Sequence, residues 1–566
     1  MKRIKVLPPE ISRKIAAGEI VERPVSVVKE LGENSIDAGA SEIRVELEAG
    51  GKNRIRVQDN GMGMSRDDAL LCFERHSTSK ISKVEDLFRI ATLGFRGEAL
   101  SSISAVSLLT LKTSDGLEDK AVQVEREGDR LLAIRDIAFP RGTSVEVQNL
   151  FFNFPARKKF LRSDQAELGL IVKYLTLVAL AYPELRLTLH HGQKESLNCP
   201  PVAGLRERIF QLYGKAFLEK LMEIDHEESG IRIFGFSSRP PSGRRTRANQ
   251  TFFVNKRPVK DRILHSALNQ AFRRLLEKDS FAEAFLFLTL PPSEVDVNVH
   301  PAKAEVRFRD SQAVFRLVLR SIDKAVLHET GIKEIYASSI PPMTAPSQRD
   351  LSHKMPIFVA EGRTLFEPDI SSALSSRGKI FPRVLGQYLE SYIVTEDKDG
   401  LLIIDQHNAH ERVLFEQYLE IDSQKKWPQA MSLVPLLIEL SPSQVLSLEN
   451  NQKFLEEVGF RIEAMGGRSF SVKEFPDLFK PEEAQAVFLA LLEEVREGRV
   501  SEKKEKLLAT MACQTAVKAG QPLSPEKMEY LVERLFRTSN PSLCPHGRPV
   551  LIKVTKAQIE KGLRRK

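Results

Sequence analysis

Apolar residues recur at helical spacing in residues 24–40, PVSVVKELGENSIDAGA. A proline opens this segment and a glycine lies near its end, as is common where helices begin and end. The apolar positions form one stripe of the predicted helix, made up of Val27, Val28, Leu31 and Ile36. The polar face carries Glu30, Asn34 and Asp37 at positions i, i+4 and i+7. Most such faces are simply exposed to solvent, so the helix by itself does not define a site.

A period-two alternation follows over residues 41–59 and predicts a β-hairpin. The run SEIRVELE alternates apolar and polar residues, AGGKN forms a turn, and RIRVQD resumes the alternation. The second strand runs into the glycine-rich turn Asp59-Asn60-Gly61-Met62-Gly63. A carboxylate four residues before a carboxamide, together with such a turn, suits a site that holds an ion and a nucleotide.

A second glycine-rich turn, GFRGEAL at residues 94–100, precedes an apolar helical pattern. Backbone N–H groups at the start of a helix point away from it and form a natural cradle for phosphate. Glycine-rich turns before helices are also common structural caps, so this segment alone does not establish a phosphate site.

The order of strands and helices predicts a multidomain α+β protein. We place a first unit at residues 1–204 and a second at residues 205–334. Residues 335–378 are rich in Ser and Pro and lack periodicity, which is typical of a linker. The last unit, residues 379–566, begins with the strands SYIVTED and GLLIIDQH, joined by a Lys-Asp-Gly turn. It closes with a helix capped by Ser524.

The composition is that of a soluble globular protein, with 42% hydrophobic and 28% charged residues in a chain of 566. The net charge of +8 permits a polyanionic partner without identifying one. We expect no signal peptide and no membrane span, because no apolar run reaches the ~18–20 residues that a span needs. Four cysteines are too few and too scattered for a disulfide framework, so a reducing cytoplasm fits best: Cys72, Cys199, Cys513 and Cys544.

Several long motifs in fixed order resemble known proteins. KELGENSIDAGA, DNGMG, GFRGEAL and RGTSVEV are similar to the GHKL ATPase domain. IAAGEIVERP, RHSTSK, NLFFNFPARKKFL, VNKRP and NVHPAKAEVRF resemble specifically the MutL family of DNA mismatch-repair proteins. The match covers residues 1–330 nearly continuously and resumes from about 380. It implies a GHKL ATPase α/β sandwich, an α/β transducer domain like ribosomal protein S5, the linker, and a C-terminal α+β dimerisation and endonuclease domain.

The resemblance implies that the first domain binds ATP and Mg²⁺. Glu30 would be the general base that polarises the water attacking the γ-phosphate, and Asn34 would hold Mg²⁺ between the phosphates. Asp59 would accept the adenine amino group. Lys303, in the HPAK segment of the second domain, would reach the γ-phosphate from outside the ATPase domain.

Further residues are implied to surround the nucleotide. Gly61 and Gly63 would let the backbone approach the base, and Thr143 would lie on the base side. The lid over the nucleotide would contain Thr78, Ser79 and Lys80. The N–H groups that reach the phosphates would belong to Gly94, Phe95, Arg96 and Gly97.

Two features of residues 24–40 stay unexplained by the sequence. Gly32 stands where the family usually has an aliphatic residue, although a glycine inside a helix costs about 1 kcal/mol relative to alanine. Glu33 lies close to Glu30, so the residues alone do not choose between the two as the base. Only the resemblance favours Glu30.

The C-terminal segment DQHNAHERVLFE, residues 405–416, resembles the family's endonuclease motif, with Asn408 where an alanine is expected. Asp405, His407, Glu411 and Glu416 occupy the expected positions. If the helix begins near His407, then His407 and Glu411 share one face at i, i+4, a spacing that lets two ligands reach one ion. We expect His410 to be an exposed helix residue.

Two more segments, ACQTAVK at 512–518 and CPHGRP at 544–549, match the endonuclease members of the family. Thiolate, imidazole and carboxylate together suit Zn²⁺ or Mn²⁺. The predicted metal ligands are Asp405, His407, Glu411, Cys513, Cys544 and His546, and Asp405 and Glu411 would also be catalytic. A buried, inert Cys513 is the ordinary alternative.

The first functional hypothesis is a mismatch-repair ATPase with its own metal-dependent endonuclease. The expected partners are DNA, a MutS-type mismatch recognition protein and a second copy of the chain, with a cytoplasmic location on the nucleoid. Arg157–Lys159 would contact the DNA backbone or form a solvated turn. A sliding clamp would bind at Gln429–Pro435, where the Gln lies one residue further from the Pro than expected.

The second hypothesis is a non-nuclease matchmaker that uses ATP-driven closure only to recruit a separate nuclease. Its C-terminal cluster would then be a structural zinc site. A type II topoisomerase or a chaperone of the same superfamily is a third possibility, but nothing after residue 330 resembles a topoisomerase cleavage core.

Overall fold

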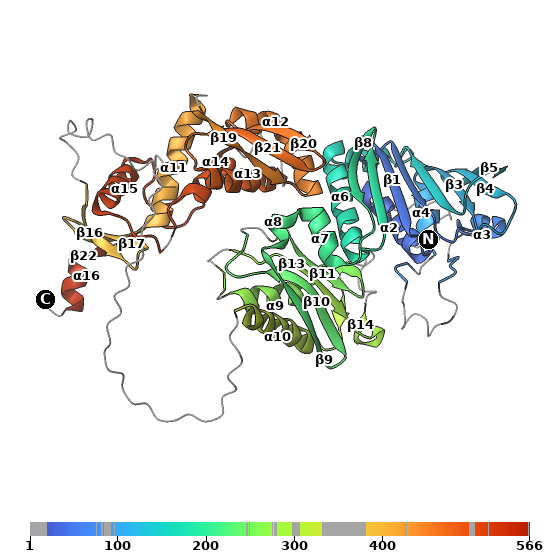
Figure 1. The fold of residues 1–566 in the computed structure, drawn as a ribbon, viewed down its shortest axis with the longest axis horizontal. Coiled ribbons are helices and arrows are strands. Elements are labelled where there is room, and N and C mark those ends of the chain that lie inside the picture. The colour runs from blue at the N-terminus through green and yellow to red at the C-terminus, as the bar shows by residue number, and fades with distance from the viewer. Residues whose placement is uncertain are drawn as a thin grey trace, which may run out of the picture. The chain divides into compact units, whose positions relative to one another are not determined.

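The computed structural model describes two compact units, one before residue 331 and the other, apart from Ser441–Ser443, after residue 380 (Figure 1). The residues described are 20–74, 76–80, 83, 92–94, 97–244, 247, 249–273, 275–276, 280–296, 306–330, 381–424, 427–496, 504–518, 520–563 and 565. Phe95, Arg96, Lys303 and the predicted linker therefore lie outside the described residues, and the predicted domain boundaries stay predictions. Within the described ranges, no helix has the length and apolar character needed to cross a membrane.

An eight-stranded sheet forms the first part of the N-terminal unit, in the order β5-β4-β3-β6-β2-β1-β7-β8. Its strands are β1 Glu42–Glu48, β2 Arg54–Asp59, β3 Leu108–Ser114, β4 Ala121–Glu127, β5 Arg130–Ile137, β6 Gly142–Gln148, β7 Arg186–His191 and β8 Lys194–Cys199. Only β1 and β7 pair in parallel. The predicted hairpin over residues 41–59 is confirmed, because β1 and β2 pair antiparallel. β2 also pairs with β6, which places Asp59 opposite Thr143.

Helices pack against this sheet and against one another. They are α2 Pro24–Asp37, α3 Arg66–Leu71, α4 Ala99–Ala105, α5 Pro155–Lys159 and α6 Asp164–Ala181, with a 3₁₀ turn η1 at Ala49–Gly51. α2 contacts β1, β2, α4 and α6, so it lies between the sheet and its neighbouring helices. Val27, Val28 and Leu31 of its apolar stripe are buried as predicted, whereas Ile36 is only partly buried. The helix ends where Gly39 adopts a positive φ of 71°.

Gly32 is explained by a neighbour that the sequence does not reveal. The ring of Tyr174, on α6, lies over this position, and its hydroxyl donates to the carbonyl of Lys29 at 3.3 Å. A Cβ added at Gly32 would lie 3.7 Å from the Tyr174 Oη, an ordinary van der Waals contact. There is room for a methyl group, whereas a longer aliphatic side chain would have to pack against the Tyr174 ring.

Replacing Gly32 by alanine is therefore expected to stabilise the N-terminal unit by about 1 kcal/mol. Alanine has the higher helix propensity and lowers the conformational entropy of the unfolded chain. Gly32→Leu should destabilise it by about 1–3 kcal/mol through overpacking against Tyr174. Thermal and urea unfolding of the full chain measures both. Gly39→Ala is the matched control and should destabilise, because its φ of 71° is strained for any L side chain. Equal stability of Gly32→Leu and wild type would contradict this account.

The second part of the N-terminal unit is a five-stranded sheet in the order β12-β11-β13-β10-β9. The elements are α7 Leu205–Tyr213, α8 Lys215–Leu218, β9 Leu221–Glu228, β10 Ile231–Ser238, β11 Gln250–Val254, β12 Arg257–Val259, α9 Arg262–Phe272, β13 Ala284–Thr289, η3 Pro292–Glu294, β14 Val295–Asp296, β15 Arg307–Phe308 and α10 Ser311–Thr330. α9 and α10 pack together, and α10 also covers β9. A single apolar cluster joins these helices to the sheet.

The C-terminal unit contains two sheets, in the orders β16-β17-β18-β22 and β19-β21-β20. The strands are β16 Arg383–Tyr388, β17 Tyr392–Asp397, β18 Gly400–Asp405, β19 Gln429–Glu439, β20 Arg461–Gly466, β21 Ser469–Pro476 and β22 Leu551–Thr555. The helices are α11 Gln406–Ser423, α12 Pro442–Glu457, α13 Pro481–Arg496, α14 Lys504–Thr515, α15 Pro525–Arg537 and α16 Lys556–Gly562. The predicted β17–β18 hairpin and the Ser524 cap of α15 are both confirmed. The predicted clamp segment lies on β19, where the pairing with β21 shifts register between Met431 and Leu436.

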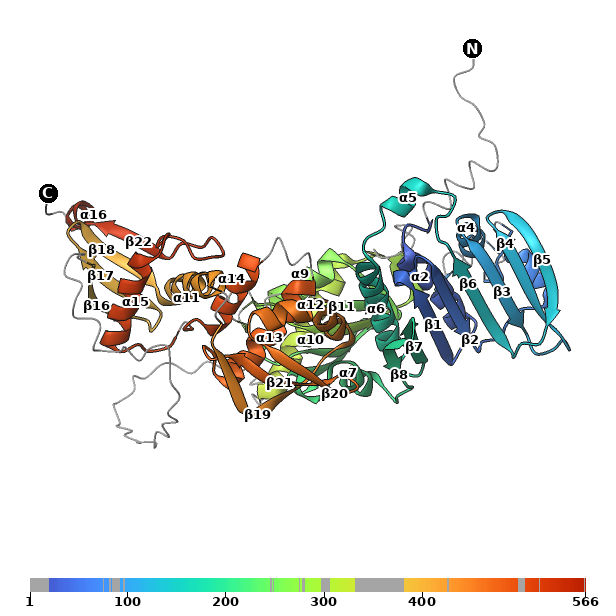
Figure 2. The ribbon, with the colours of Figure 1, turned by 90° about the horizontal axis from the view of Figure 1, so that it is seen from above.

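Helix α11 belongs to two hydrophobic cores at once. Ala409 and Val413, near its start, pack into the core under the four-stranded sheet. Leu414 and Tyr418 pack into the core of the three-stranded sheet. The helix is therefore buried on more than one side, and it also contacts α14 and α15 (Figure 2). This arrangement positions the residues predicted to bind metal.

Candidate functional site

The polar face of α2 meets residues 92–94, which lead into the glycine-rich turn at 94–100, through Asp37. The Asp37 carboxylate accepts hydrogen bonds from the backbone N–H groups of Leu93 at 2.8 Å and Gly94 at 2.9 Å. Its Oδ2 also lies 2.6 Å from the ammonium of Lys80, which donates a second hydrogen bond to Asn34 Oδ1 at 2.9 Å. Lys80 therefore places a positive charge on the oxygen predicted to hold Mg²⁺. The structure brings Asn34, Lys80 and Gly94 together, as predicted, and adds Asp37, for which no role was predicted.

Asp59 lies at the end of β2, in contact with Ser35 of α2. It accepts hydrogen bonds from the Ser35 hydroxyl at 2.7 Å and from the backbone N–H groups of Gly61 at 2.9 Å and Thr143 at 3.3 Å. Burial raises the pKa of Asp59, and these three hydrogen bonds partly oppose the shift. An ionised carboxylate has about four acceptor positions, so one stays available to a ligand.

Close packing explains both glycines after Asp59. A Cβ at Gly61 would come within 2.9 Å of Ala38. Gly63 has a φ of 69°, and a Cβ there would lie 1.8 Å from the carbonyl oxygen of Ser114. No other residue fits at Gly63 without moving the backbone of the turn.

The predicted lid residues lie beside the end of the glycine-rich turn. Gly97 has a φ of 64°, and a Cβ there would lie 2.4 Å from the carbonyl oxygen of Ser77. Thr78 accepts a hydrogen bond at its Oγ1 from the backbone N–H of Lys80, at 3.2 Å. Ser79, between Thr78 and Lys80, is exposed. Residues 77–80 and Gly97 are therefore held in contact although they are far apart in sequence.

Glu30 and Glu33 point into different surroundings. Glu33 is paired with Lys29 at 3.8 Å and lines a small cavity of about 30 Å³ with Tyr174, Tyr182 and other residues. Glu30 is half-buried and makes no hydrogen bond or ion pair with the residues described. Glu33 is thus held in the interior, whereas the Glu30 carboxylate remains available for a ligand.

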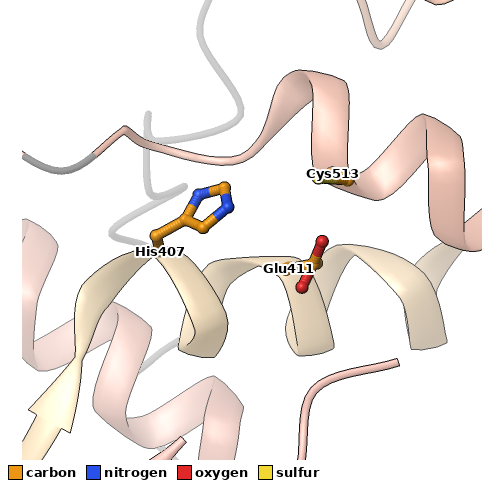
Figure 3. Close-up of side chains that lie close together, drawn as sticks. All are labelled: His407, Glu411 and Cys513. Atoms are coloured by element: carbon orange, nitrogen blue, oxygen red, sulfur yellow. The ribbon is translucent and has the colours of Figure 1, made fainter. Parts of the chain in front are cut away.

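A second cluster lies between α11 and α14 in the C-terminal unit. His407 and Glu411 project from one face of α11 toward Cys513 on α14 (Figure 3). The ligand atoms of these three residues lie within 4.8 Å of one another. The same limit holds for Glu411, Cys544 and His546. Glu411 is 1% exposed and belongs to both groups, so four other predicted ligands surround its buried carboxylate.

The electrostatics of this cluster centre on Glu411. Burial alone would raise its pKa, but hydrogen bonds from His546, Cys513 and Cys544 and the charge of His546 together lower it to about 2. The His546 Nδ1 lies 3.0 Å from the Glu411 Oε1. Its hydrogen bonds with Cys544 and Glu411 raise the pKa of His546 to about 9. The carboxylate is therefore ionised at neutral pH, which suits a cation.

Two backbone groups of Val517, its carbonyl and its N–H, orient the imidazole rings of His407 and His410. His407 Nδ1 lies 2.9 Å from the carbonyl oxygen of Val517, which can only accept, so Nδ1 carries the proton and Nε2 is left for a metal. The N–H of Val517 donates to His410 Nδ1 at 3.0 Å. The prediction that His410 is exposed is wrong. It is 7% exposed, because α11 packs on two cores, and burial lowers its pKa to about 4.

Asp405 has a different position from the other predicted ligands. Its carboxylate accepts a hydrogen bond from the backbone N–H of Asn408 at 2.9 Å and caps the start of α11. It does not belong to either group of clustered ligands among the described residues. Asn408 itself donates from its side chain to the carbonyl of Pro549 at 3.1 Å. This bond ties α11 to the segment that carries Cys544 and His546, and alanine could not make it.

Other residues of the motif hold the loops that supply the ligands. Gln406 is fully buried and donates to the carbonyls of Glu390 and Lys518 at 2.9 Å each. Arg412 donates to the carbonyl of Leu543 at 2.7 Å, next to Cys544. Glu416 accepts from the N–H and the hydroxyl of Ser539, at 3.0 and 2.7 Å. Of these, Glu416 was predicted only as a motif position, and Gln406 and Arg412 were missed because their partners are distant in sequence.

Comparisons with known proteins identify the domains that carry these clusters. Residues 22–129 match the family model "Histidine kinase-, DNA gyrase B-, and HSP90-like ATPase". Residues 209–327 match "DNA mismatch repair protein, C-terminal domain", and residues 385–523 match "MutL C terminal dimerisation domain". The chain therefore has the ATPase domain of the GHKL class, followed by mismatch-repair and dimerisation domains.

Full-length relatives define the family. The chain is 38% identical to the DNA mismatch repair protein MutL of Koribacter versatilis and 36% identical to that of Solibacter usitatus, and each alignment covers 100% of both chains. It is 35% identical to the MutL protein of Acidobacterium capsulatum, again over the full length of both. The chain belongs to the MutL family of DNA mismatch repair proteins. The predicted family and the multidomain α+β fold class are confirmed.

Proposed function

We propose that ATP binding and hydrolysis at the α2 site control strand nicking at the α11 site during mismatch repair. Glu30, Asn34, Asp59 and Lys80 would act at the first site. Glu411, with the histidine and cysteine ligands around it, would act at the second. The sharing of the buried Glu411 carboxylate by two groups of potential ligands is the observation that carries the nuclease proposal.

At the nucleotide site, Glu30 would orient and deprotonate the water that attacks the γ-phosphate. The oxygen atoms of Asn34 and Asp37 already bind the ammonium of Lys80, so this end of the site accepts a cation. Asn34 would hold Mg²⁺, which prefers oxygen ligands and, when bound, neutralises charge on the phosphates. Lys80 would then leave Asn34 and follow the phosphates as part of the lid.

The other nucleotide contacts would come from the base and phosphate sides. Asp59 would accept the adenine amino group at its remaining acceptor position. Gly61, Gly63 and Thr143 would form the surface beneath the base. The N–H groups from Gly94 to Gly97 would cradle the phosphates, which requires that the N–H of Gly94 exchange its hydrogen bond with Asp37 for one with phosphate. Phe95, Arg96 and Lys303 retain their proposed roles, although they lie outside the described residues.

At the C-terminal site, His407, Glu411 and Cys513 would hold one cation, and Glu411, Cys544 and His546 another. Sulfur, nitrogen and oxygen donors together fit Zn²⁺ or Mn²⁺. Bound cations would activate water and stabilise the leaving oxygen of the cleaved strand. Asp405, at the start of α11, would add negative charge beside the ligands.

The alternative is a matchmaker with a structural zinc site and no nuclease. A structural zinc is held by four protein ligands with no open position. Here each group offers three ligands, five different residues in total, which leaves room for water on each cation. This count favours the endonuclease.

DNA would bind the N-terminal unit through basic side chains. A cleft of about 1060 Å³ lies between α6 and the second sheet. Its basic lining residues are Lys29, Lys173, Arg247, Lys260, Arg262 and Arg273, with one carboxylate, Asp261. Lys158 and Lys159 on α5 are also exposed, whereas the Arg157 guanidinium lies 5.2 Å from the ring centre of Phe154. Such contacts bind the phosphate backbone of DNA and do not depend on its base sequence, which is what a mismatch-triggered nuclease needs.

The remaining partners rest on the family. Two copies of the chain would associate through the C-terminal dimerisation domain, and a MutS-type protein would deliver the mismatch signal. A sliding clamp would contact β19, subject to the shifted position of Gln429.

Nicking of supercoiled plasmid in Mn²⁺ tests the nuclease. Asp405→Asn is expected to lower the nicking rate by about 10- to 100-fold, as the loss of a residue beside metal ligands commonly does. Asparagine also caps helices well, so α11 should stay intact. Glu420→Gln, an exposed position on the same helix, is the matched control and should nick like wild type. Equal, negligible nicking by wild type and Asp405→Asn would remove the endonuclease hypothesis.

A further inference from the structure

A tight hairpin in the second sheet presents one arginine to the nucleotide-binding domain. β11 and β12 are joined by Asn255 and Lys256, which have positive φ values of 47° and 66°. The side chain of Asn255 exchanges two hydrogen bonds with the backbone of Leu290, at 3.0 and 3.1 Å. The hairpin tip is therefore fixed to the end of β13, and the direction of the next residue, Arg257, is set by the second domain.

Arg257 reaches the glycine-rich turn beside α2. It is 8% exposed, and its Nη2 donates a hydrogen bond to the carbonyl oxygen of Thr92. The Thr92 hydroxyl donates to the carbonyl of Gly94 at 2.7 Å, which closes the turn on itself. The next two N–H groups of the turn bind Asp37. Residues 92–94 are thus held from α2 on one side and from the second domain on the other.

The charge of Arg257 is matched to its surroundings. Glu33, Tyr182 and Arg257 line the same small cavity. Burial lowers the pKa of Arg257, while the nearby Glu33 and Asp37 raise it. A buried guanidinium that donates to a carbonyl makes a charge-assisted hydrogen bond, which is stronger and more directional than a neutral one. Arginine is also hard to replace there, because lysine offers no planar set of donors.

We propose that Arg257 is a positioning residue for the nucleotide site, through which the second domain holds the phosphate-binding turn in place. Its effect passes through the backbone of Thr92–Gly94, so it does not touch the nucleotide. The proposal rests on the proposed role of this turn in binding ATP phosphates. It follows that the placement of the second domain and the affinity for ATP are coupled through this contact.

Replacing Arg257 by alanine is expected to raise the KM for ATP by about tenfold, because a hydrogen bond to a charged group is lost and the turn is held from one side only. The kcat should change by less than about threefold, since Glu30 is untouched. Arg257→Lys keeps the charge and one donor and should recover part of the affinity. If Arg257→Ala does not fold, as judged by circular dichroism, the KM of Arg257→Lys for ATP is the test. A KM above that of wild type supports the proposal, and a KM equal to that of wild type contradicts it.

Lys256→Ala is the matched control. Lys256 is the adjacent basic residue and pairs with Glu184 in the first domain at 3.3 Å, but it makes no hydrogen bond to Thr92, Leu93 or Gly94. We expect its KM for ATP to equal that of wild type. If Lys256→Ala and Arg257→Ala raise the KM equally, general loosening of the two domains explains the effect and the proposal fails.

Hydrogen exchange on the full chain gives a second readout. A non-hydrolysable ATP analogue should slow amide exchange in both the 92–98 and the 250–259 peptides of wild type. In Arg257→Ala the analogue should slow amide exchange in the 92–98 peptide only. Unchanged KM and unchanged protection of both peptides would overturn the proposal. Asn34→Ala tests the proposed nucleotide site separately from the role of Arg257. If that variant still binds and turns over ATP like wild type, the proposed nucleotide site itself is wrong.

Discussion

Glu30→Ala is expected to lower the kcat for ATP hydrolysis by about 100-fold or more, the usual contribution of a general base, while nucleotide binding is retained. The reason is that Glu30 lies one turn before Asn34 on the same face of α2 and makes no hydrogen bond or ion pair with the described part of the chain. Its carboxylate is therefore available to hold water. Steady-state turnover and binding of a fluorescent ATP analogue measure the two effects separately.

Glu33→Gln is the control, since Glu33 is a carboxylate on the same helix that is held by Lys29 near Tyr174. It should retain most of the turnover. Asn34→Ala should lose both binding and turnover, because an oxygen ligand for the cation disappears. Wild-type turnover in Glu30→Ala combined with inactive Glu33→Gln would move the role of the base to Glu33.

Glu411→Gln is expected to abolish tightly bound transition metal and to lower plasmid nicking by about 100-fold or more. The carboxylate is shared by two groups of ligands, so its loss affects both proposed cations at once. Removal of a buried charge partner also leaves His546 without the carboxylate that raises its pKa. Elemental analysis of the purified full chain gives the metal content, and plasmid nicking in Mn²⁺ gives the activity.

Two further variants sharpen this test. Glu420→Gln should keep both the metal and the nicking activity, because Glu420 is exposed on the same helix. Cys513→Ser should reduce metal content while it leaves the second group, Glu411, Cys544 and His546, in place. If Glu411→Gln retains the metal content of wild type, Glu411 is not a ligand. Retained metal in wild type without any nicking would support the structural zinc site.

Local sequence patterns predicted individual helices and hairpins, whereas the C-terminal ligands were found in another way. The α2 helix, the β1–β2 hairpin and the capped helix α15 were predicted correctly, because periodicity, caps and turn residues act between near neighbours in sequence. The six ligand candidates of the C-terminal site were found through motif resemblance. Their assembly depends on α11 and α14 packing together, and four of the other five candidates do lie around the Glu411 carboxylate.

The errors and omissions have one common origin. His410 was expected to be exposed, because a helix of mixed polarity usually has a solvated face. α11 instead lies between two cores and buries residues on several sides. Asn408 and Gln406 had no assigned role, because their partners Pro549 and Lys518 are more than a hundred residues away. Arg257 was part of a recognised motif, but its hydrogen bond to Thr92 joins two domains.

By itself, the sequence determined the family, the fold class, the helices and hairpins with strong local signals, and the candidate ligands at both sites. The tertiary structure alone decided that Glu33 is held inside while Glu30 stays available, that Tyr174 accounts for Gly32, and that Glu411 is shared by two ligand groups. It also decided that Arg257 donates a hydrogen bond to the carbonyl oxygen of Thr92. The physical reason is that burial and hydrogen-bond partners arise from packing between distant segments, and spacing along the chain does not specify which segments will meet.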